Sequence, residues 1–275
     1  PEGGRLLRWH YDGRPVIHWP EDADWSLPTR IRGGNPVLFP FLGRHFVDGE
    51  IGRWRDGQGT IRHLPMHGFA RELRHAVDME QGGCVLALCD TEATRAMYPF
   101  AFAFQVRYQL TADGRALRTE LVTRNKGDAP LPYYAGHHFY FAIPHDERAG
   151  WCVDIDAAAV LRQNADGSLR RLPALPGPLS LADPAIVDAM HLLGSQQPVR
   201  LRHAASGRGL TLQLAHPEAL PWLALTSWTE FDTSDFYCLE PWLGLPDAIH
   251  HGQGLRWLAP GAGERAVCTL ALDQW

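Results

Sequence analysis

One acidic residue stands out in the sequence for the chemistry that it could perform. Glu240 lies in the stretch Tyr-Cys-Leu-Glu-Pro-Trp at 237–242, which is typical of a β-strand that enters a proline turn. A carboxylate with these neighbours is expected to lie against apolar surface, where its charged form is poorly solvated. Its pKa should therefore rise toward the range that suits a general base.

Two histidines lie in similarly apolar settings and are candidate partners for this carboxylate. His67 lies in Met-His-Gly-Phe-Ala-Arg at 66–71, and His138 lies in Gly-His-His-Phe-Tyr-Phe at 136–141. Because neighbouring residues of a strand point to opposite faces, only one of His137 and His138 can readily face a given pocket. One carboxylate and two imidazoles favour acid–base chemistry without a metal or a covalent intermediate. Taken singly, each also has a structural explanation, such as a turn hydrogen bond for His67.

Three arginines lie around the His67 turn and around a passage rich in glycine and proline at 33–40. Arg32, Arg44 and Arg71 could form surface salt bridges, or they could supply planar donors to sugar hydroxyls or to a phosphate. The passage lacks the glycine spacing and the Lys-Ser/Thr pair of a phosphate loop. It therefore predicts an irregular, rigid wall along a cleft.

The sequence argues against a metal and against a disulfide framework. No pair of histidines has the spacing of metal ligands on a helix, and we expect no cofactor. The five cysteines are odd in number, widely scattered and without a Cys-x-x-Cys pair. Each lies in a β-like run, so reduced, buried thiols in a cytoplasmic protein are the favoured interpretation.

Composition excludes several classes of partner. The net charge is −5 and no basic run occurs, so the electrostatic footprint of a nucleic-acid-binding protein is missing. No apolar stretch approaches the length of a membrane span, and the first residues show no signal segment. These features predict a cytoplasmic protein that binds neither nucleic acid nor membranes.

The elements that must position these residues are predicted to be strands. Two alternating runs at 105–110 and 115–122 flank an Asp-Gly turn, which is the strongest hairpin signal in the chain. Helical periodicity is nearly absent, with at most one turn near 183–190. A single all-β domain over residues 1–275, built as a large antiparallel β-sandwich, is the predicted fold. Further strands are predicted at 6–10, 15–19, 83–89, 133–143, 151–155, 199–203, 210–215, 222–228, 236–239, 255–258 and 267–272.

Four of these stretches occur together in an order and spacing that resemble the aldose 1-epimerase (galactose mutarotase-like) family. They are Arg-Gly-Gly-Asn-Pro-Val-Leu-Phe-Pro at 32–40, the His67 stretch, the His138 stretch, and Leu-Glu-Pro-Trp-Leu-Gly at 239–244. The resemblance extends from about residue 30 to the Pro-Gly turn at 260–261. It implies the β-sandwich of that family, a sugar substrate and no cofactor.

The resemblance also implies roles for individual residues. His138 would be the general acid, since Tyr-Phe follows it, although Phe139 stands where the family usually has proline. Glu240 would be the general base, and His67 would hold the substrate near its ring oxygen. Arg44 and Arg71 would bind hydroxyls or a phosphate, and Asp188 would be the family's substrate-binding acid. Within the same fold, Arg32 and Arg71 would permit a phosphorylated hexose as substrate. The family's terminal Pro-Gly-Glu is stretched here over 260–264, so the last loop is expected to differ.

The predicted function is a mutarotase that opens and recloses the ring of a hexose. Alternatives are a hexose-6-phosphate mutarotase of the same fold and a sugar-binding or sensing domain without catalysis. A glycosidase ranks last, because it normally needs two flanking carboxylates and only one well-placed acid is evident. The expected partner is a free sugar, possibly 6-phosphorylated, bound by a monomer or weak homodimer. Trp222, Trp228 and Trp242 are expected to stack on the sugar.

Overall fold

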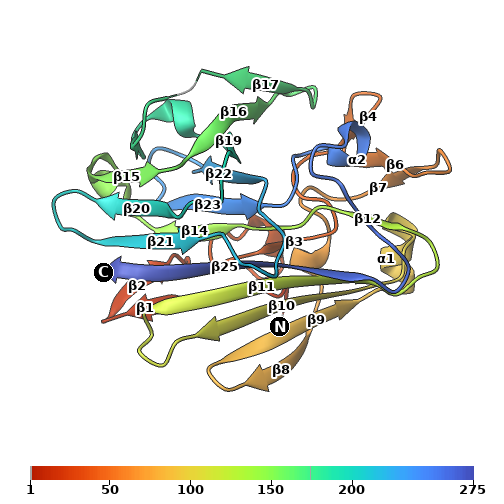
Figure 1. The fold of residues 1–275 in the computed structure, drawn as a ribbon, viewed down its shortest axis with the longest axis horizontal. Helices are drawn as coiled ribbons and strands as arrows, with labels where there is room; N and C mark the ends of the chain where they lie inside the picture. Colours follow the sequence, from red (N-terminus) through yellow and green to blue (C-terminus); the bar gives the residue numbers. More distant parts are fainter. Residues whose placement is uncertain (1, 174) are drawn as a thin grey trace.

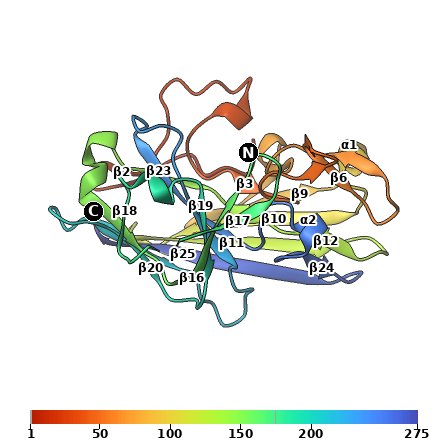
Figure 2. The same cartoon turned by 90° about the horizontal axis from the view of Figure 1, so that it is seen from above.

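The computed structural model describes residues 2–173 and 175–275. Within these residues, two large antiparallel sheets of ten and nine strands form the body of the protein (Figures 1 and 2). The ten-stranded sheet follows the order β1-β2-β14-β23-β22-β19-β16-β17, with β3 and β13 joined at its middle. Its strands are β1 (Trp9–Tyr11), β2 (Arg14–Ile17), β3 (Val37–Leu38), β13 (Gly136–His137), β14 (Phe139–Ala142), β16 (Ala157–Gln163), β17 (Leu169–Leu172), β19 (Ala189–Leu193), β22 (Ala224–Trp228) and β23 (Phe236–Trp242).

The nine-stranded sheet follows the order β18-β15-β20-β21-β25-β11-β10-β9-β8. The hairpin around the Asp-Gly turn lies inside this sheet, between β25 and β9, and its strands Phe102–Leu110 and Ala116–Asn125 pair without a bulge. Its strands are β8 (Ala76–Glu80), β9 (Gly83–Cys89), β10 (Phe102–Leu110), β11 (Ala116–Asn125), β15 (Trp151–Asp154), β18 (Leu179–Ser180), β20 (Val199–His203), β21 (Gly209–Gln213) and β25 (Gly263–Gln274).

Small elements complete the described part of the chain. Two-stranded ribbons join β4 (Phe46–Val47) to β5 (Glu50–Ile51), β6 (Arg53–Arg55) to β7 (Ile61–His63), and β12 (Leu131–Tyr133) to β24 (Arg256–Leu258). The α-helices are α1 (Glu92–Met97) and α2 (Ala248–His251), and the 3-10 turns are η1 (Pro28–Arg30), η2 (Ala70–Glu72), η3 (His145–Gly150) and η4 (Pro184–Ile186). No helix among the described residues has both the length and the apolar character needed to cross a membrane.

Alternation along the strands divides the ten-stranded sheet into a core face and an outer face. In β23, Tyr237 and Leu239 belong to the large core that also contains residues of the nine-stranded sheet, such as Phe104 and Leu270. Cys238 points the other way and packs with Tyr140 in a small separate cluster. Because successive side chains of a strand face opposite sides, Glu240 lies on the same face as Cys238. The core therefore holds the two sheets together while the opposite face remains available for a site.

The structure confirms the predicted sandwich and corrects several of its details. The strand predicted at 133–143 is broken into β12, β13 and β14, and β23 continues past residue 239 to Trp242, so the expected proline turn after Glu240 is wrong. Pro241 lies where the pairing of β23 with its neighbour is interrupted, between β13 and β14. The turn near 183–190 is confirmed only as η4, and β16 and β19 were not predicted.

The cysteine prediction is confirmed in part. All five cysteines are free, and Cys238 and Cys268 are buried. Cys89, however, is exposed at the end of β9, and Cys84 and Cys152 are only half-buried. The expectation of five buried thiols is therefore wrong for these three. Cys89 and Cys152 alternate with buried neighbours and lie on the outer faces of their strands, whereas Cys84 packs partly buried against the core near the start of β9.

Candidate active site

A cavity of about 400 Å³ lies on the outer face of the ten-stranded sheet. Strands β16, β19, β22 and β23 supply its floor, and loops from the first quarter of the chain supply one wall. Its volume falls within the range of small-ligand sites. The residues that line it are Arg32, Gly43, Arg44, Met66, His67, Arg71, His138, Tyr140, Gln163, Val187, Asp188, Met190, Thr226, Trp228, Thr229, Glu230, Glu240, Trp242 and Pro246.

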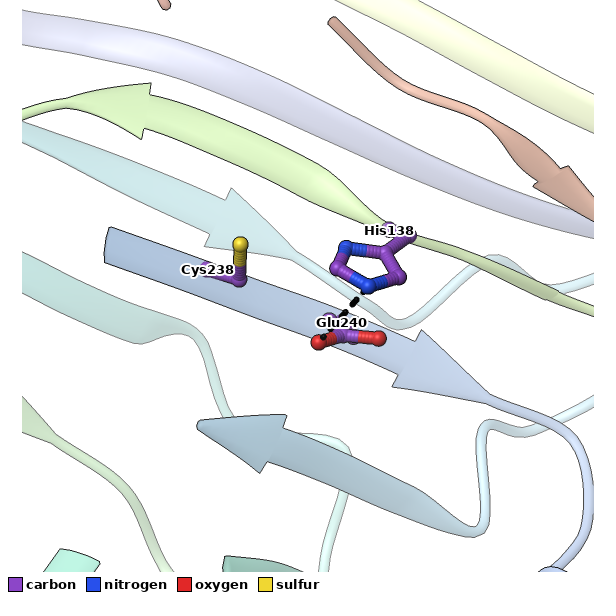
Figure 3. Close-up of side chains that lie close together, drawn as sticks. All are labelled: His138, Cys238 and Glu240. Carbon is purple, nitrogen blue, oxygen red and sulfur yellow. Dashed lines mark ion pairs between the residues drawn. The ribbon is translucent and has the colours of Figure 1, made fainter. Parts of the chain in front are cut away.

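Glu240 and His138 face each other at the base of this cavity (Figure 3). The Nε2 atom of His138 lies 3.5 Å from Oε1 of Glu240, and the two side chains are 8% and 2% exposed. The second carboxylate oxygen, Oε2, and the other imidazole nitrogen, Nδ1, are buried without a hydrogen-bond partner. Buried polar atoms are almost always paired, so Oε2 and Nδ1 leave unused hydrogen-bonding capacity at the base of the cavity.

Burial sets the proton affinities of this pair. It raises the pKa of the Glu240 carboxyl well above its usual value, and the nearby Asp188 carboxylate adds to the rise. It lowers the pKa of the His138 imidazole well below its usual value, helped by the positive charges of Arg71 and Arg32. Both directions disfavour charge in the empty site. The favoured arrangement is therefore uncharged, with a single proton on Glu240 and none on the Nε2 atom of His138.

A hydrogen-bond chain from the core holds His138 in position. Because the sheet is interrupted here, the His138 amide donates to Oδ1 of Asn35 at 2.9 Å instead of to a neighbouring strand. The Nδ2 group of Asn35 donates to Nδ1 of His137, which leaves Nε2–H of His137 to donate to Thr119. His137 is fully buried in the core. The prediction that the two neighbouring histidines face opposite sides is thus confirmed, and His138 is the one that faces the cavity.

His67 reaches the cavity from a strained turn. Its φ of 67° lies in the left-handed region, which is uncommon for a residue with a side chain. The next residue, Gly68, also has positive φ, and a Cβ there would lie 2.1 Å from the Phe39 carbonyl oxygen. The Gly43 amide donates to Nδ1 of His67 at 3.1 Å. This contact places the imidazole proton on Nε2, which makes that atom a donor.

The three predicted arginines all line the cavity, each with a different partner. Arg32 forms an ion pair with Glu230, with 2.9 Å between Nη2 and Oε1. Arg44 donates to the side chain and backbone of Gln163, and Arg71 donates to the Met66 carbonyl. The Nε atoms of Arg32 and Arg71 are buried without a partner.

Asp188 completes the set of predicted site residues. It lines the cavity with a φ of 57°, and burial raises the pKa of its carboxyl while the guanidinium groups of Arg44 and Arg162 oppose the rise. All seven residues predicted for the site are therefore brought together around one cavity: His67, His138, Glu240, Arg32, Arg44, Arg71 and Asp188.

The sequence did not single out some residues that line the cavity. Thr226 lies directly opposite Glu240 in the sheet, and its buried hydroxyl has no partner. Thr226 lies two residues before Trp228 on β22, so strand alternation, which places both side chains on the same face, could have identified Thr226 as a lining residue. Among the three tryptophans, Trp228 and Trp242 line the cavity, but the expectation for Trp222 is wrong, because its indole lies in the core and donates to the Val267 carbonyl.

Cys238 joins the catalytic candidates to form a group with metal-ligating atoms. One ligand atom from each of His138, Cys238 and Glu240 lies within 4.8 Å of the others, and all three residues are buried. Figure 3 shows Cys238 and Glu240 on β23 and His138 at the start of the neighbouring strand. Spacing along the sequence gave no sign of this group, because it is assembled across strands.

Comparisons with known proteins agree with this architecture. A family model described as Aldose 1-epimerase matches residues 2–269. The Slr1438 protein from Synechocystis sp. PCC 6803 superposes with a TM-score of 0.84 at 29% identity, over 99% of this chain and 89% of that protein. The galactose mutarotase related enzyme from Lactobacillus acidophilus gives a TM-score of 0.79 at 24% identity, over 96% and 89% of the two chains. The chromosomal protein LacX from Lactococcus lactis subsp. lactis is 25% identical over 244 residues, which are 82% of this chain and 78% of that protein.

Proposed function

We propose that this chain, which belongs to the aldose 1-epimerase family, is a mutarotase that interconverts the α and β anomers of a free hexose. The observation that carries the proposal is the buried pair of Glu240 and His138 at the base of the cavity, 3.5 Å apart and each with an unpaired polar atom. An acid and a base that share one proton are the two groups that hemiacetal opening requires.

In this mechanism the ring opens by two linked proton transfers. The Glu240 carboxylate takes the proton of the C1 hydroxyl while protonated His138 gives its proton to the ring oxygen. The bond between C1 and the ring oxygen breaks, and the C1–O1 bond becomes the carbonyl of an open-chain aldehyde. After rotation about C1–C2, both transfers run in reverse and the ring closes on the other face. Each positioned group contributes roughly 10²–10⁴-fold.

The number of protons on the pair stays at one throughout this cycle. The pair is charge-separated when it faces the closed ring and uncharged when it faces the aldehyde. Because burial favours the uncharged arrangement in the folded protein, the site is matched electrostatically to the opened sugar. Stabilising the state that follows bond cleavage lowers the barrier more than it tightens binding of the closed ring.

Other cavity residues are proposed to hold the sugar in place. The Nε2–H group of His67 would donate to a sugar oxygen near the ring, since Nδ1 already accepts from Gly43. Trp228 and Trp242 offer faces for the apolar side of the ring. Arg44, Arg71 and Asp188 would bind the remaining hydroxyls.

Charge around the cavity favours a neutral sugar over a phosphorylated one. The lining carries three guanidinium groups, from Arg32, Arg44 and Arg71, and three carboxyl groups, from Asp188, Glu230 and Glu240. Because the pair of Glu240 and His138 carries one proton in either arrangement, the lining has a net charge of only +1. Arg32 is already neutralised by Glu230, so an incoming phosphate would have to displace a bonded carboxylate. A hexose 6-phosphate remains the second candidate, because the Nε atoms of Arg32 and Arg71 are buried and unpaired.

The decisive experiment is polarimetry of freshly dissolved α-glucose and α-galactose, with saturation-transfer NMR to follow the exchange of anomers. The proposal expects faster mutarotation with catalytic amounts of the protein. A protein that binds these sugars without accelerating their mutarotation would instead be a binding or sensing domain.

A comparison of kcat/KM for glucose and glucose 6-phosphate at fixed ionic strength separates the two substrate candidates. We expect a higher kcat/KM for free glucose. The variant Glu230→Gln should raise kcat/KM for glucose 6-phosphate by about tenfold or more, because it frees Arg32 for a charge-assisted bond to the phosphate. A preference of about a hundredfold for the phosphate that vanishes in Arg32→Ala or Arg71→Ala would overturn the choice of a free sugar.

A further inference from the structure

Three buried side chains at the base of the cavity could bind a metal ion together, and the proposed reaction requires no metal. Cys238 and Glu240 lie two residues apart on β23, so they face the same side of the sheet. His138 lies opposite Glu240 on the neighbouring strand, whose register pairs Phe139 with Leu239. One nitrogen, one sulfur and one oxygen ligand thus lie within 4.8 Å of one another (Figure 3).

We propose that His138, Cys238 and Glu240 bind a zinc ion, and that this ion competes with the sugar for the catalytic pair. The ion would be an inhibitor and not a cofactor, since the proposed reaction needs the same two atoms free. Binding of zinc stands independently of the proposed function, whereas inhibition rests on it.

The distances fit zinc with little movement. Tetrahedral zinc with bonds of about 2.0–2.2 Å to nitrogen and oxygen separates those two ligands by roughly 3.3 Å. The observed separation of Nε2 of His138 and Oε1 of Glu240 is 3.5 Å. The Cys238 sulfur, within 4.8 Å of its partners, would need to approach by about 1 Å, because a zinc–sulfur bond is about 2.3 Å long. The fourth position would face the cavity and take water.

Charge and ligand chemistry favour zinc over other ions. A thiolate and a carboxylate together cancel the charge of a divalent cation, which a buried site requires. A thiolate combined with an imidazole selects a borderline or soft metal such as zinc over magnesium or calcium, which prefer oxygen. Zinc binding would release two protons, one from the Cys238 thiol and one from the pair, so affinity should rise with pH.

Cys238 is the ligand that distinguishes the proposed zinc site from the catalytic pair. Cys238 is fully buried in a small cluster with Tyr140 and Phe236, on the cavity side of the sheet and apart from the main core. It does not touch the cavity surface, so it takes no part in the proposed proton transfers. Replacing it should therefore leave mutarotation intact, and this separates the zinc site from the catalytic machinery.

The test compares the parent protein with Cys238→Ala and with Cys89→Ala, which removes the exposed thiol as a matched control. Calorimetric titration with zinc chloride should show one site in the parent and in Cys89→Ala. Cys238→Ala should bind zinc at least about tenfold more weakly because it lacks the thiolate ligand. In mutarotation assays with glucose, zinc should raise KM without changing kcat in the parent, and chelation with EDTA should restore activity. Magnesium at the same concentrations should have no effect.

Three results would overturn the zinc site: no zinc binding by the parent, equal affinity in Cys238→Ala, or loss of affinity in Cys89→Ala instead. Inhibition that lowers kcat without raising KM would overturn competition with the sugar. Thermal denaturation of Cys238→Ala without zinc checks that the variant is folded. If the parent accelerated no mutarotation, the proposed function would fail, and the calorimetric comparison would still decide the metal site.

Discussion

Replacing Glu240 with glutamine should lower activity and raise stability at the same time. Glutamine keeps the shape of the side chain but cannot accept the proton of the C1 hydroxyl. The loss of a positioned base should cost about 10²–10⁴-fold in kcat, which corresponds to roughly 3–5 kcal/mol of barrier. The same change removes a carboxyl whose ionised form is disfavoured by burial and by Asp188.

The sign of the stability effect follows from proton linkage. The pKa of Glu240 is raised in the folded protein above its ordinary value of 4.5. Above that pH the unfolded chain loses this proton while the folded protein keeps it, so the parent loses stability relative to the glutamine variant as pH rises. The pH-dependent gain in the free energy of unfolding of Glu240→Gln over the parent should be near zero below about pH 4.5. Above that pH it should grow by up to about 1.4 kcal/mol per pH unit, until the pKa of Glu240 in the folded protein is reached.

The assay pairs polarimetry with thermal denaturation between pH 4.5 and 8. Each kcal/mol should raise Tm by a few degrees, on the order of 2–4 °C for a chain of this size. Glu264→Gln is a matched control of opposite sign, because Arg256 and Tyr133 lower the pKa of Glu264 in the folded protein and it should lose stability at neutral pH. The reasoning is refuted if Glu240→Gln keeps activity within about tenfold of the parent, or if its gain in Tm does not grow with pH.

The remaining predictions concern the histidines. His138→Ala should reduce kcat by about 10²–10⁴-fold with little change in fold. His137→Ala should keep kcat per folded molecule and lose about 2–4 kcal/mol of stability, because it empties a core position and removes the hydrogen bonds of His137 with Asn35 and Thr119. Kinetics and urea denaturation of both variants test this, and exchanged outcomes would show that the motif is misassigned by one residue. The protein should also lose stability below pH 6.5, since burial lowers the pKa of His45 and His191 to about 4 and that of His137 to about 3. As the pH falls, the unfolded chain binds these protons before the folded protein does, so each histidine lowers the free energy of unfolding by up to about 1.4 kcal/mol per pH unit. The urea midpoint of a His191→Asn variant should therefore fall less steeply than that of the parent between pH 6.5 and 5, and an equally steep fall would contradict this account.

The site could be predicted from the sequence because its key residues are titratable side chains within otherwise apolar stretches. Glu240 is a carboxylate within an apolar strand, and the turn at His67 combines a titratable side chain with a following glycine. The parity of neighbouring strand residues predicted that only one of His137 and His138 faces the cavity, and the family resemblance favoured His138. The structure places His138 at the cavity and His137 in the core. The sandwich was predictable for a similar reason, since the alternation around the Asp-Gly turn at 113–114 is local.

What escaped prediction depends on contacts between distant segments. Trp222 shares the parity of Trp228, but residues 221–223 precede β22 and are held by Gln196, so strand alternation does not extend to them. The hydrogen bond that holds the His138 backbone is accepted by Asn35, about a hundred residues away. The ion pair between Arg32 and Glu230 joins residues that lie 198 positions apart.

The two sides of the cavity come from different parts of the chain, and this has a consequence for how the protein could change over evolution. The proton-moving pair is held by adjoining strands in the middle of a ten-stranded sheet. Half of the groups proposed to bind the sugar, His67, Arg44 and Arg71, come from the segment between Gly43 and Arg71. Because a sheet constrains its residues more tightly than loops do, mutations in that segment can alter the choice of sugar without misaligning the pair, as long as Asn35, which holds His138, is kept. A laboratory chimera that exchanges only residues 43–71 with those of a relative would be a direct way to transfer specificity onto unchanged chemistry.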